Sequence, residues 1–130
     1  MYKEELSDLV SVVADYAEIK LVYFFGSKAE GKAGALSDFD FAFYIDQKDH
    51  KKLYELRLSL IDRLSLLLKT DKVDVALLNL IDSPEMKYNI IKYGKLIFER
   101  EPFKVLIEPK ILNEYFDFHS MLLRNNLMRA

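Results

Sequence analysis

The sequence predicts an α/β or α+β domain in which helices pack over a small β-sheet. Apolar segments with helical spacing alternate with short runs of β-branched and aromatic residues. The resulting order is helix, strand, loop, strand, helix, strand, helix, strand, helix. The chain has 130 residues, of which 51% are hydrophobic and 31% charged, as is ordinary for a globular protein. This length favours a single domain, residues 1–130, with a core of its own.

The first half of the chain is predicted to hold one helix and two strands. Residues 4–16 place their apolar side chains at helical spacing, which indicates an amphipathic helix. Residues 19–25 and 39–45 are rich in β-branched and aromatic residues, which is typical of buried strands. The loop between them, residues 26–37, carries three of the four glycines of the chain.

The second half begins with the longest predicted helix, residues 48–69, whose leucines form one broad apolar stripe. A strand follows over residues 73–78. Ser83 and Pro84 then mark a helix start, because a capping side chain precedes proline at the first helical position. That helix is expected to end at Gly94, and residues 95–99 form a short strand.

The C-terminal segment is predicted to end in a helix over residues 110–128. Residues 103–108 fit either a strand or a helix, and Pro109 is expected to interrupt them. The final helix is apolar on more than one face, so it is either buried or covered by another protein. This helix is therefore a candidate partner interface.

Composition excludes several classes of protein and site. The net charge of −2 gives no basic footprint for nucleic acid. The chain has no cysteine and only two histidines, which excludes disulfides and thiolate metal sites and disfavours zinc. No apolar run approaches the roughly 20 residues of a membrane span, and the N-terminus lacks a signal-peptide core. We therefore expect a cytoplasmic protein.

Two acids at the start of the second predicted strand point to a metal site. Asp38 and Asp40 are separated by one residue, so on a strand they share a face. The aromatic residues that alternate with them, from Phe39 onward, then face the core. Two carboxylates held close together repel unless a cation lies between them, and hard oxygen ligands suit magnesium. An acid pair at a loop-to-strand entry also fits plain solvated carboxylates.

A third acid and a glycine–serine pair extend this site. Asp74 lies on the polar side of the strand over residues 73–78. Gly26 and Ser27 offer N–H groups and a hydroxyl to phosphate, and Ser27 is predicted to cap a short helix beginning at Lys28. Three carboxylates beside an anion site favour two-metal nucleotidyl transfer. In that chemistry Asp74 also accepts the proton of the attacking hydroxyl. Lys28 fits a phosphate ligand or a solvated loop charge equally.

The spacing of these residues resembles a known signature. Gly26-Ser27, ten residues and then Asp38-Phe39-Asp40 match the pattern of the polymerase-beta-like nucleotidyltransferase superfamily. The short chain and the SDFDFAF continuation look most like the minimal nucleotidyltransferases (MNT). The resemblance covers residues 19–79 and implies a mixed sheet flanked by helices.

The resemblance also implies a function. MNT proteins are commonly encoded beside a HEPN-domain partner, a toxin with ribonuclease character, and resemble its antitoxin. Some transfer AMP from ATP to a tyrosine of the toxin. By this resemblance Gly26, Ser27 and Lys28 hold the triphosphate of ATP, and Asp38, Asp40 and Asp74 hold two magnesium ions. Many members have arginines in the loop where this chain has Lys28 and Glu30, which makes its loop less basic.

Three functional hypotheses follow from the sequence. The first is an enzyme that transfers AMP to a HEPN toxin, which makes it the antitoxin of that toxin. The second is a non-catalytic antitoxin that neutralises the toxin by covering it. The third is a small-molecule nucleotidyltransferase, for which a chain of 130 residues leaves little room for a substrate domain.

Overall fold

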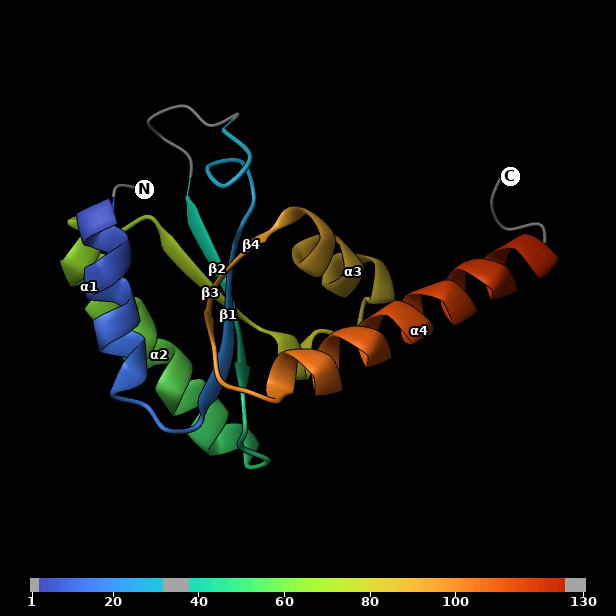
Figure 1. Cartoon of the computed structure of the whole chain (residues 1–130), viewed down its shortest axis with the longest axis horizontal. Coiled ribbons are helices and arrows are strands. Elements are labelled where there is room, and N and C mark those ends of the chain that lie inside the picture. Colours follow the sequence, from blue (N-terminus) through green and yellow to red (C-terminus); the bar gives the residue numbers. More distant parts are fainter. Residues whose placement is uncertain (1–2, 32–37, 126–130) are drawn as a thin grey trace.

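A four-stranded sheet lies between two pairs of helices in the computed structural model of the chain (Figure 1). The structure describes residues 3–31 and 38–125. Within these residues the helices are α1 (Lys3–Ala14), α2 (His50–Leu68), α3 (Pro84–Tyr93) and α4 (Phe103–Arg124). The strands are β1 (Ile19–Phe25), β2 (Phe39–Ile45), β3 (Val73–Leu77) and β4 (Lys95–Glu99), and a 3-10 turn, η1 (Leu78–Leu80), follows β3.

The sheet is mixed, as the resemblance implied. Its strand order is β3-β2-β1-β4, with β1 antiparallel to both β2 and β4 and with β2 parallel to β3. The parallel pair requires a crossover, and α2 provides it. The C-terminal end of β1 and the N-terminal ends of β2 and β3 therefore lie at the same end of the sheet. The loop of residues 26–37 leaves the sheet at this end, and six of its residues lie outside the described part of the chain.

Two apolar layers sandwich the sheet. On one face, β1 and β2 pack Phe24, Phe41 and Phe43 against α1 and α2, and these side chains are at most 4% exposed. On the other face Leu21 and Tyr23 pack against α3 and the start of α4. Each fully buried large side chain contributes roughly 1.5–3 kcal/mol to folding. The alternation predicted for residues 39–45 and 73–77 is confirmed, because the odd-numbered side chains of β2 and β3 all face α1 and α2.

The predicted interruption at Pro109 is wrong. Helix α4 begins at Phe103 and runs through Pro109, which is exposed inside the helix. The reason is packing on both sides of the proline: Ile107 contacts the layer between the sheet and α3, and Ile111 is only 5% exposed. These contacts hold the two segments in line although proline removes one helical hydrogen bond. The predicted helix extends to residue 128, whereas α4 ends at Arg124. Residues 126–128 lie outside the part of the chain that the structure describes.

The C-terminal part of α4 extends beyond the sheet and the other helices (Figure 1). It is fixed to α3 by the Tyr88 and Tyr115 rings, whose centroids lie 3.9 Å apart in a stacked arrangement. None of the helices in the described ranges is both long and apolar enough to cross a membrane.

Candidate active site

The three predicted acids lie at the end of the sheet where β1 ends and β2 and β3 begin. Asp40 is half-buried in β2, opposite Phe25 of β1 on one side and directly opposite Asp74 of β3 on the other. Asp38 is exposed immediately before β2. The parallel register therefore brings Asp40 and Asp74 side by side on the face covered by α3 and α4. The roles of these acids as ligands or bases stay predictions.

The electrostatics of this group of acids show their mutual repulsion. The pKa of Asp40 is raised above its ordinary value, first by burial and then by the negative charges of Asp74 and Asp38. Each of these causes disfavours the ionised carboxylate. A cation placed among the three acids would oppose this repulsion and favour the ionised form of Asp40.

Gly26 lies directly against the carboxylate of Asp40. Its φ angle is +82°, and a Cβ atom there would collide with the Asp40 carboxylate, whose Cγ would lie 3.2 Å away. Only glycine permits both this conformation and this close approach. Gly31 also has a positive φ, of +72°, but a Cβ there would meet no atom within 4 Å. Gly31 is therefore needed only for the conformation of the turn, whereas Gly26 also lets the backbone of the loop lie against Asp40.

The loop after Gly26 forms a turn, so the predicted helix beginning at Lys28 is wrong. The Glu30 N–H donates to the Gly26 carbonyl at 3.1 Å, and the Gly31 N–H donates to the Lys28 carbonyl at 3.4 Å. Glycines with positive φ at both ends confine this segment to a single turn. Ser27 is exposed at its start and directly follows Gly26, the residue that lies against Asp40.

Lys28 does not join the acids. Its Nζ lies 4.5 Å from the centroid of the Phe39 ring, an arrangement typical of a cation–π contact. Phe39 packs towards α1 and α2, on the face opposite to Asp40. Thus the structure brings together Gly26, Asp38, Asp40 and Asp74, with Ser27 adjacent, and places the Lys28 ammonium elsewhere.

Arg57 is a site residue that the sequence did not reveal. From α2 it reaches around the edge of the sheet, where its Nη2 donates to Asp74 Oδ1 at 3.3 Å and its Nε donates to the Val75 carbonyl at 2.7 Å. The two partners lie 17 and 18 residues away in sequence. The only signal for this contact would have been the β2–α2–β3 crossover, which places α2 along β3.

The acids fit magnesium by their chemistry. Within residues 3–31 and 38–125 no three acidic, histidine or cysteine side chains are already gathered as a metal-ligand set. Asp74 instead engages Arg57. However, Asp40 and Asp74 are direct neighbours, Asp38 acts on Asp40 through its charge, and all three supply the hard oxygen atoms that magnesium prefers.

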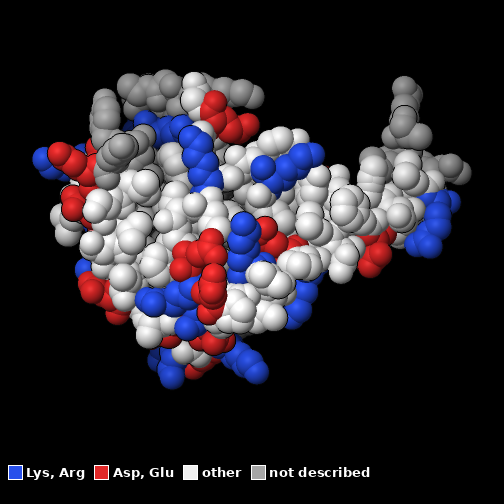
Figure 2. Space-filling model, viewed as in Figure 1, with Lys and Arg blue, Asp and Glu red and all other residues white. Residues whose placement is uncertain are grey.

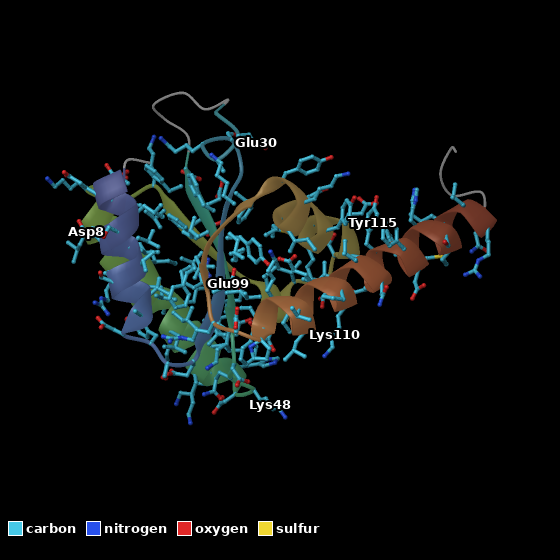
Figure 3. All side chains as sticks on the ribbon, viewed as in Figure 1. Asp8, Glu30, Lys48, Glu99, Lys110 and Tyr115 are labelled. Carbon is cyan, nitrogen blue, oxygen red and sulfur yellow. The ribbon has the colours of Figure 1, made fainter. Side chains whose placement is uncertain are left out.

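A cleft of about 490 Å³ lies between the turn at Gly26 and α3. None of the three acids lines it, but Gly26, which lies against Asp40, forms part of its wall. Its walls include Glu30, Met86, Asn89 and Tyr93. Figure 3 shows Glu30 in the turn beyond the end of the sheet, near the end of α3 that leads into β4. This volume lies within the range of roughly 300–1,000 Å³ that is usual for small-molecule sites.

The family model described as polymerase beta, nucleotidyltransferase matches residues 7–103. The chain belongs to this family. The match spans every strand and the whole group of acids, and it confirms the polymerase-beta-like fold that the glycine–serine and Asp-x-Asp spacing suggested. Among curated proteins, none matches the chain significantly.

Solved structures of toxin–antitoxin complexes share this nucleotidyltransferase fold over nearly the whole chain. A toxin–antitoxin structure with AMP-PNP has a TM-score of 0.74 at 20% identity, covering 99% of this chain and 100% of that one. A Shewanella oneidensis complex of tri-AMPylated HEPN toxin with MNT antitoxin gives 0.71 at 19% identity, with coverages of 99% and 100%. An MntA–HepT complex gives 0.71 at 19% identity, with coverages of 98% and 100%. At these identities the likeness establishes the fold.

The raised pKa of Asp40 predicts how stability depends on pH in the metal-free protein. Between the ordinary carboxyl pKa and the raised one, the folded state binds more protons than the unfolded state, so the free energy of unfolding falls as pH rises. Asp40→Asn removes this penalty while keeping the size of the side chain. We expect urea denaturation to show that the variant is more stable than wild type at pH 7, with the difference vanishing below about pH 4.

Asp46→Asn is the matched control, because Asp46 is exposed just beyond the opposite end of β2. The free energy of unfolding of this variant should depend on pH in the same way as that of wild type. Added magnesium should raise the urea concentration at the midpoint of unfolding for wild type and for Asp46→Asn, but not for Asp40→Asn. Identical pH profiles for wild type and Asp40→Asn would contradict the electrostatic account of Asp40.

Proposed function

We propose that this protein is a magnesium-dependent nucleotidyltransferase that transfers AMP from ATP to a tyrosine of a HEPN-domain toxin and thereby acts as the antitoxin. The observation that carries the proposal is the position of Asp40 within the family fold, between Gly26 and Asp74. Two solved structures of the same fold support it: one contains AMP-PNP, and another holds an AMPylated HEPN toxin with an MNT antitoxin. ATP is a cytoplasmic metabolite, so we place the reaction in the cytoplasm.

The proposed reaction is a displacement at the α-phosphorus of ATP. The tyrosine oxygen forms a bond to this phosphorus, the bond to the bridging oxygen of the β-phosphate breaks, and pyrophosphate leaves. Asp38 and Asp40 would hold one magnesium ion and all three acids a second. When bound, magnesium supplies positive charge to the triphosphate and acidifies the attacking hydroxyl. Asp74 accepts the proton of the tyrosine hydroxyl, and the exposed start of β3 leaves it reachable from solvent.

The cleft beside α3 suits the nucleoside part of ATP. Glu85 places a carboxylate in its wall, which disfavours the triphosphate there, while Met86 and Tyr93 offer apolar surface and Asn89 an amide. The triphosphate would then lie at the Gly26 end, against the loop backbone and Ser27, next to the acids. Lys28 would have to leave the Phe39 ring to reach it, so we assign phosphate binding to Gly26 and Ser27 before Lys28.

The exposed side of α4 suits the partner protein. Val105 is 74% exposed and Phe116 55% exposed, and Leu106 and Leu123 are also among the exposed large apolar residues. Figure 2 shows mostly uncharged surface along the part of α4 that extends from the body. An apolar helical surface bordered by polar residues is typical of a protein interface. We therefore assign this surface, defined by Val105, Leu106, Phe116 and Leu123, to the HEPN partner.

The transfer reaction is tested by incubating the protein with α-labelled ATP, magnesium and the HEPN-domain protein encoded beside it. We expect label on the partner with wild type, and a loss of about 10³-fold or more with Asp38→Ala/Asp40→Ala, because charge stabilisation at the phosphate is removed. Asp46→Ala removes a carboxylate from the other end of β2 and should label the partner normally. Neutralisation of the toxin without label, equal in wild type and the double variant, would instead favour an antitoxin that acts by covering it.

The interface on α4 is tested with Phe116→Glu and Leu66→Glu. Both replace an exposed apolar side chain, but Leu66 is 80% exposed on α2, on the other side of the sheet. We expect Phe116→Glu to weaken the complex with the HEPN partner at least about tenfold, because aromatic interface residues commonly contribute more than 1 kcal/mol. Leu66→Glu should bind as wild type does in calorimetric titration. Equal affinities for the two variants, both folded by circular dichroism, would place the interface elsewhere.

A further inference from the structure

We propose that Arg57 is a positioning residue that holds Asp74 in place for metal binding. This inference rests on the proposed function, because it assumes that Asp74 is a metal ligand. Arg57 itself would touch neither the nucleotide nor the acceptor. It acts through the orientation of the Asp74 carboxylate.

The guanidinium of Arg57 is fixed at two points. Its Nε donates to the Val75 carbonyl at 2.7 Å, which ties the group to the backbone of β3, and its Nη2 then reaches Asp74 Oδ1 at 3.3 Å. A planar guanidinium held by one nitrogen presents the others in a fixed direction, which a lysine ammonium cannot do. Because its guanidinium is anchored to the backbone of β3, Arg57 restricts the orientation of the neighbouring Asp74 carboxylate.

Asp74 needs such support more than Asp40 does. Asp40 lies in β2 between two strands and against Gly26, which restricts its carboxylate. Asp74 lies on β3, an outer strand of the sheet, and its side chain is 56% exposed. Among the described residues, Arg57 is the group that hydrogen-bonds to it. Without Arg57 the carboxylate is free to rotate into solvent and away from Asp40.

The contact leaves Asp74 able to bind a cation. Arg57 engages only Oδ1, and Oδ2 accepts no hydrogen bond from the described part of the chain. Carboxylates that bind metals are commonly held by a hydrogen bond to a neighbouring group, and loss of that group typically weakens metal affinity or activity about 10- to 100-fold. The two-point contact of Arg57 has the form of such a support.

Arg63 supplies a matched comparison on the same helix. Its Nη2 lies 3.1 Å from Asp15 Oδ2, and its side chain is 40% exposed, against 34% for Arg57. The two ion pairs are therefore alike in length and exposure, but only the one made by Arg57 contains a site acid. Exposed ion pairs of this kind contribute little to stability. An effect specific to Arg57 thus reports on its two contacts with β3, at Asp74 and at the Val75 carbonyl, and not on the loss of a surface ion pair.

The test measures Mn²⁺ affinity by electron paramagnetic resonance, in the presence of AMP-PNP, for wild type, Arg57→Met and Arg63→Met. Met keeps the apolar part of the side chain and removes both hydrogen bonds. We expect Arg57→Met to bind Mn²⁺ about 10- to 100-fold more weakly. Arg63→Met should stay within about twofold of wild type, since it leaves the group of acids untouched. Arg57→Lys, which keeps the charge but loses the fork, should give an intermediate value.

Two results would overturn the inference. Equal Mn²⁺ affinity in Arg57→Met and Arg63→Met would make Arg57 an ordinary surface partner, and tighter binding in Arg57→Met would make it a competitor of the metal. If Arg57→Met does not fold, Arg57→Lys takes its place in the comparison. Failure of the proposed function gives a different pattern, in which wild type and Asp38→Ala/Asp40→Ala bind Mn²⁺ equally.

Discussion

The position of Asp40 between its neighbours is the constraint on which the site depends. Three independent requirements meet at this residue: the antiparallel register with β1, the parallel register with β3, and a glycine whose missing Cβ leaves room for the carboxylate. A slip of one residue in either strand pair would turn Asp40 towards the core formed with α1 and α2. The aromatic side chains of that core therefore fix the register of the acids as firmly as they stabilise the fold.

Much of the fold follows from periodicity, which is a local property of the sequence. The alternation in β2 and β3 identified both strands and the faces of their acids, and Ser83 with Pro84 identified the start of α3. Pro109 shows where local reasoning fails. Its own preference is to end a helix, but burial of apolar side chains on both sides of it stabilises a continuous one. That contribution depends on partners distant in sequence, so the residue alone could not reveal it.

The site, like the fold, has one part that local sequence patterns predict and another that depends on contacts between distant residues. The meeting of Asp40 with Asp74 follows from strand alternation and from a crossover that joins their strands in parallel, so a sequence pattern predicts it. The contact of Arg57 with Asp74 depends on which side of α2 faces the sheet edge, and the place of Lys28 depends on the conformation of a turn. Neither is encoded by spacing. Side chains that approach a site from a separate helix or from a loop are thus the part that requires a structure.

The charges around the site determine how a nucleotide can enter it. Within the described residues, Arg57 is occupied by Asp74 and Val75, and the Lys28 ammonium lies on the Phe39 ring of the opposite face. Burial and the charges of Asp74 and Asp38 together raise the pKa of Asp40, and Glu85 places a carboxylate in the wall of the adjacent cleft. A bare triphosphate would meet repulsion from these groups. Divalent cations reverse the sign of the interaction for both sides, because they attract the carboxylates and the phosphates alike. In the proposed function, ATP would therefore enter as its magnesium complex, because the metal would supply an attraction for the phosphates that the described basic side chains do not.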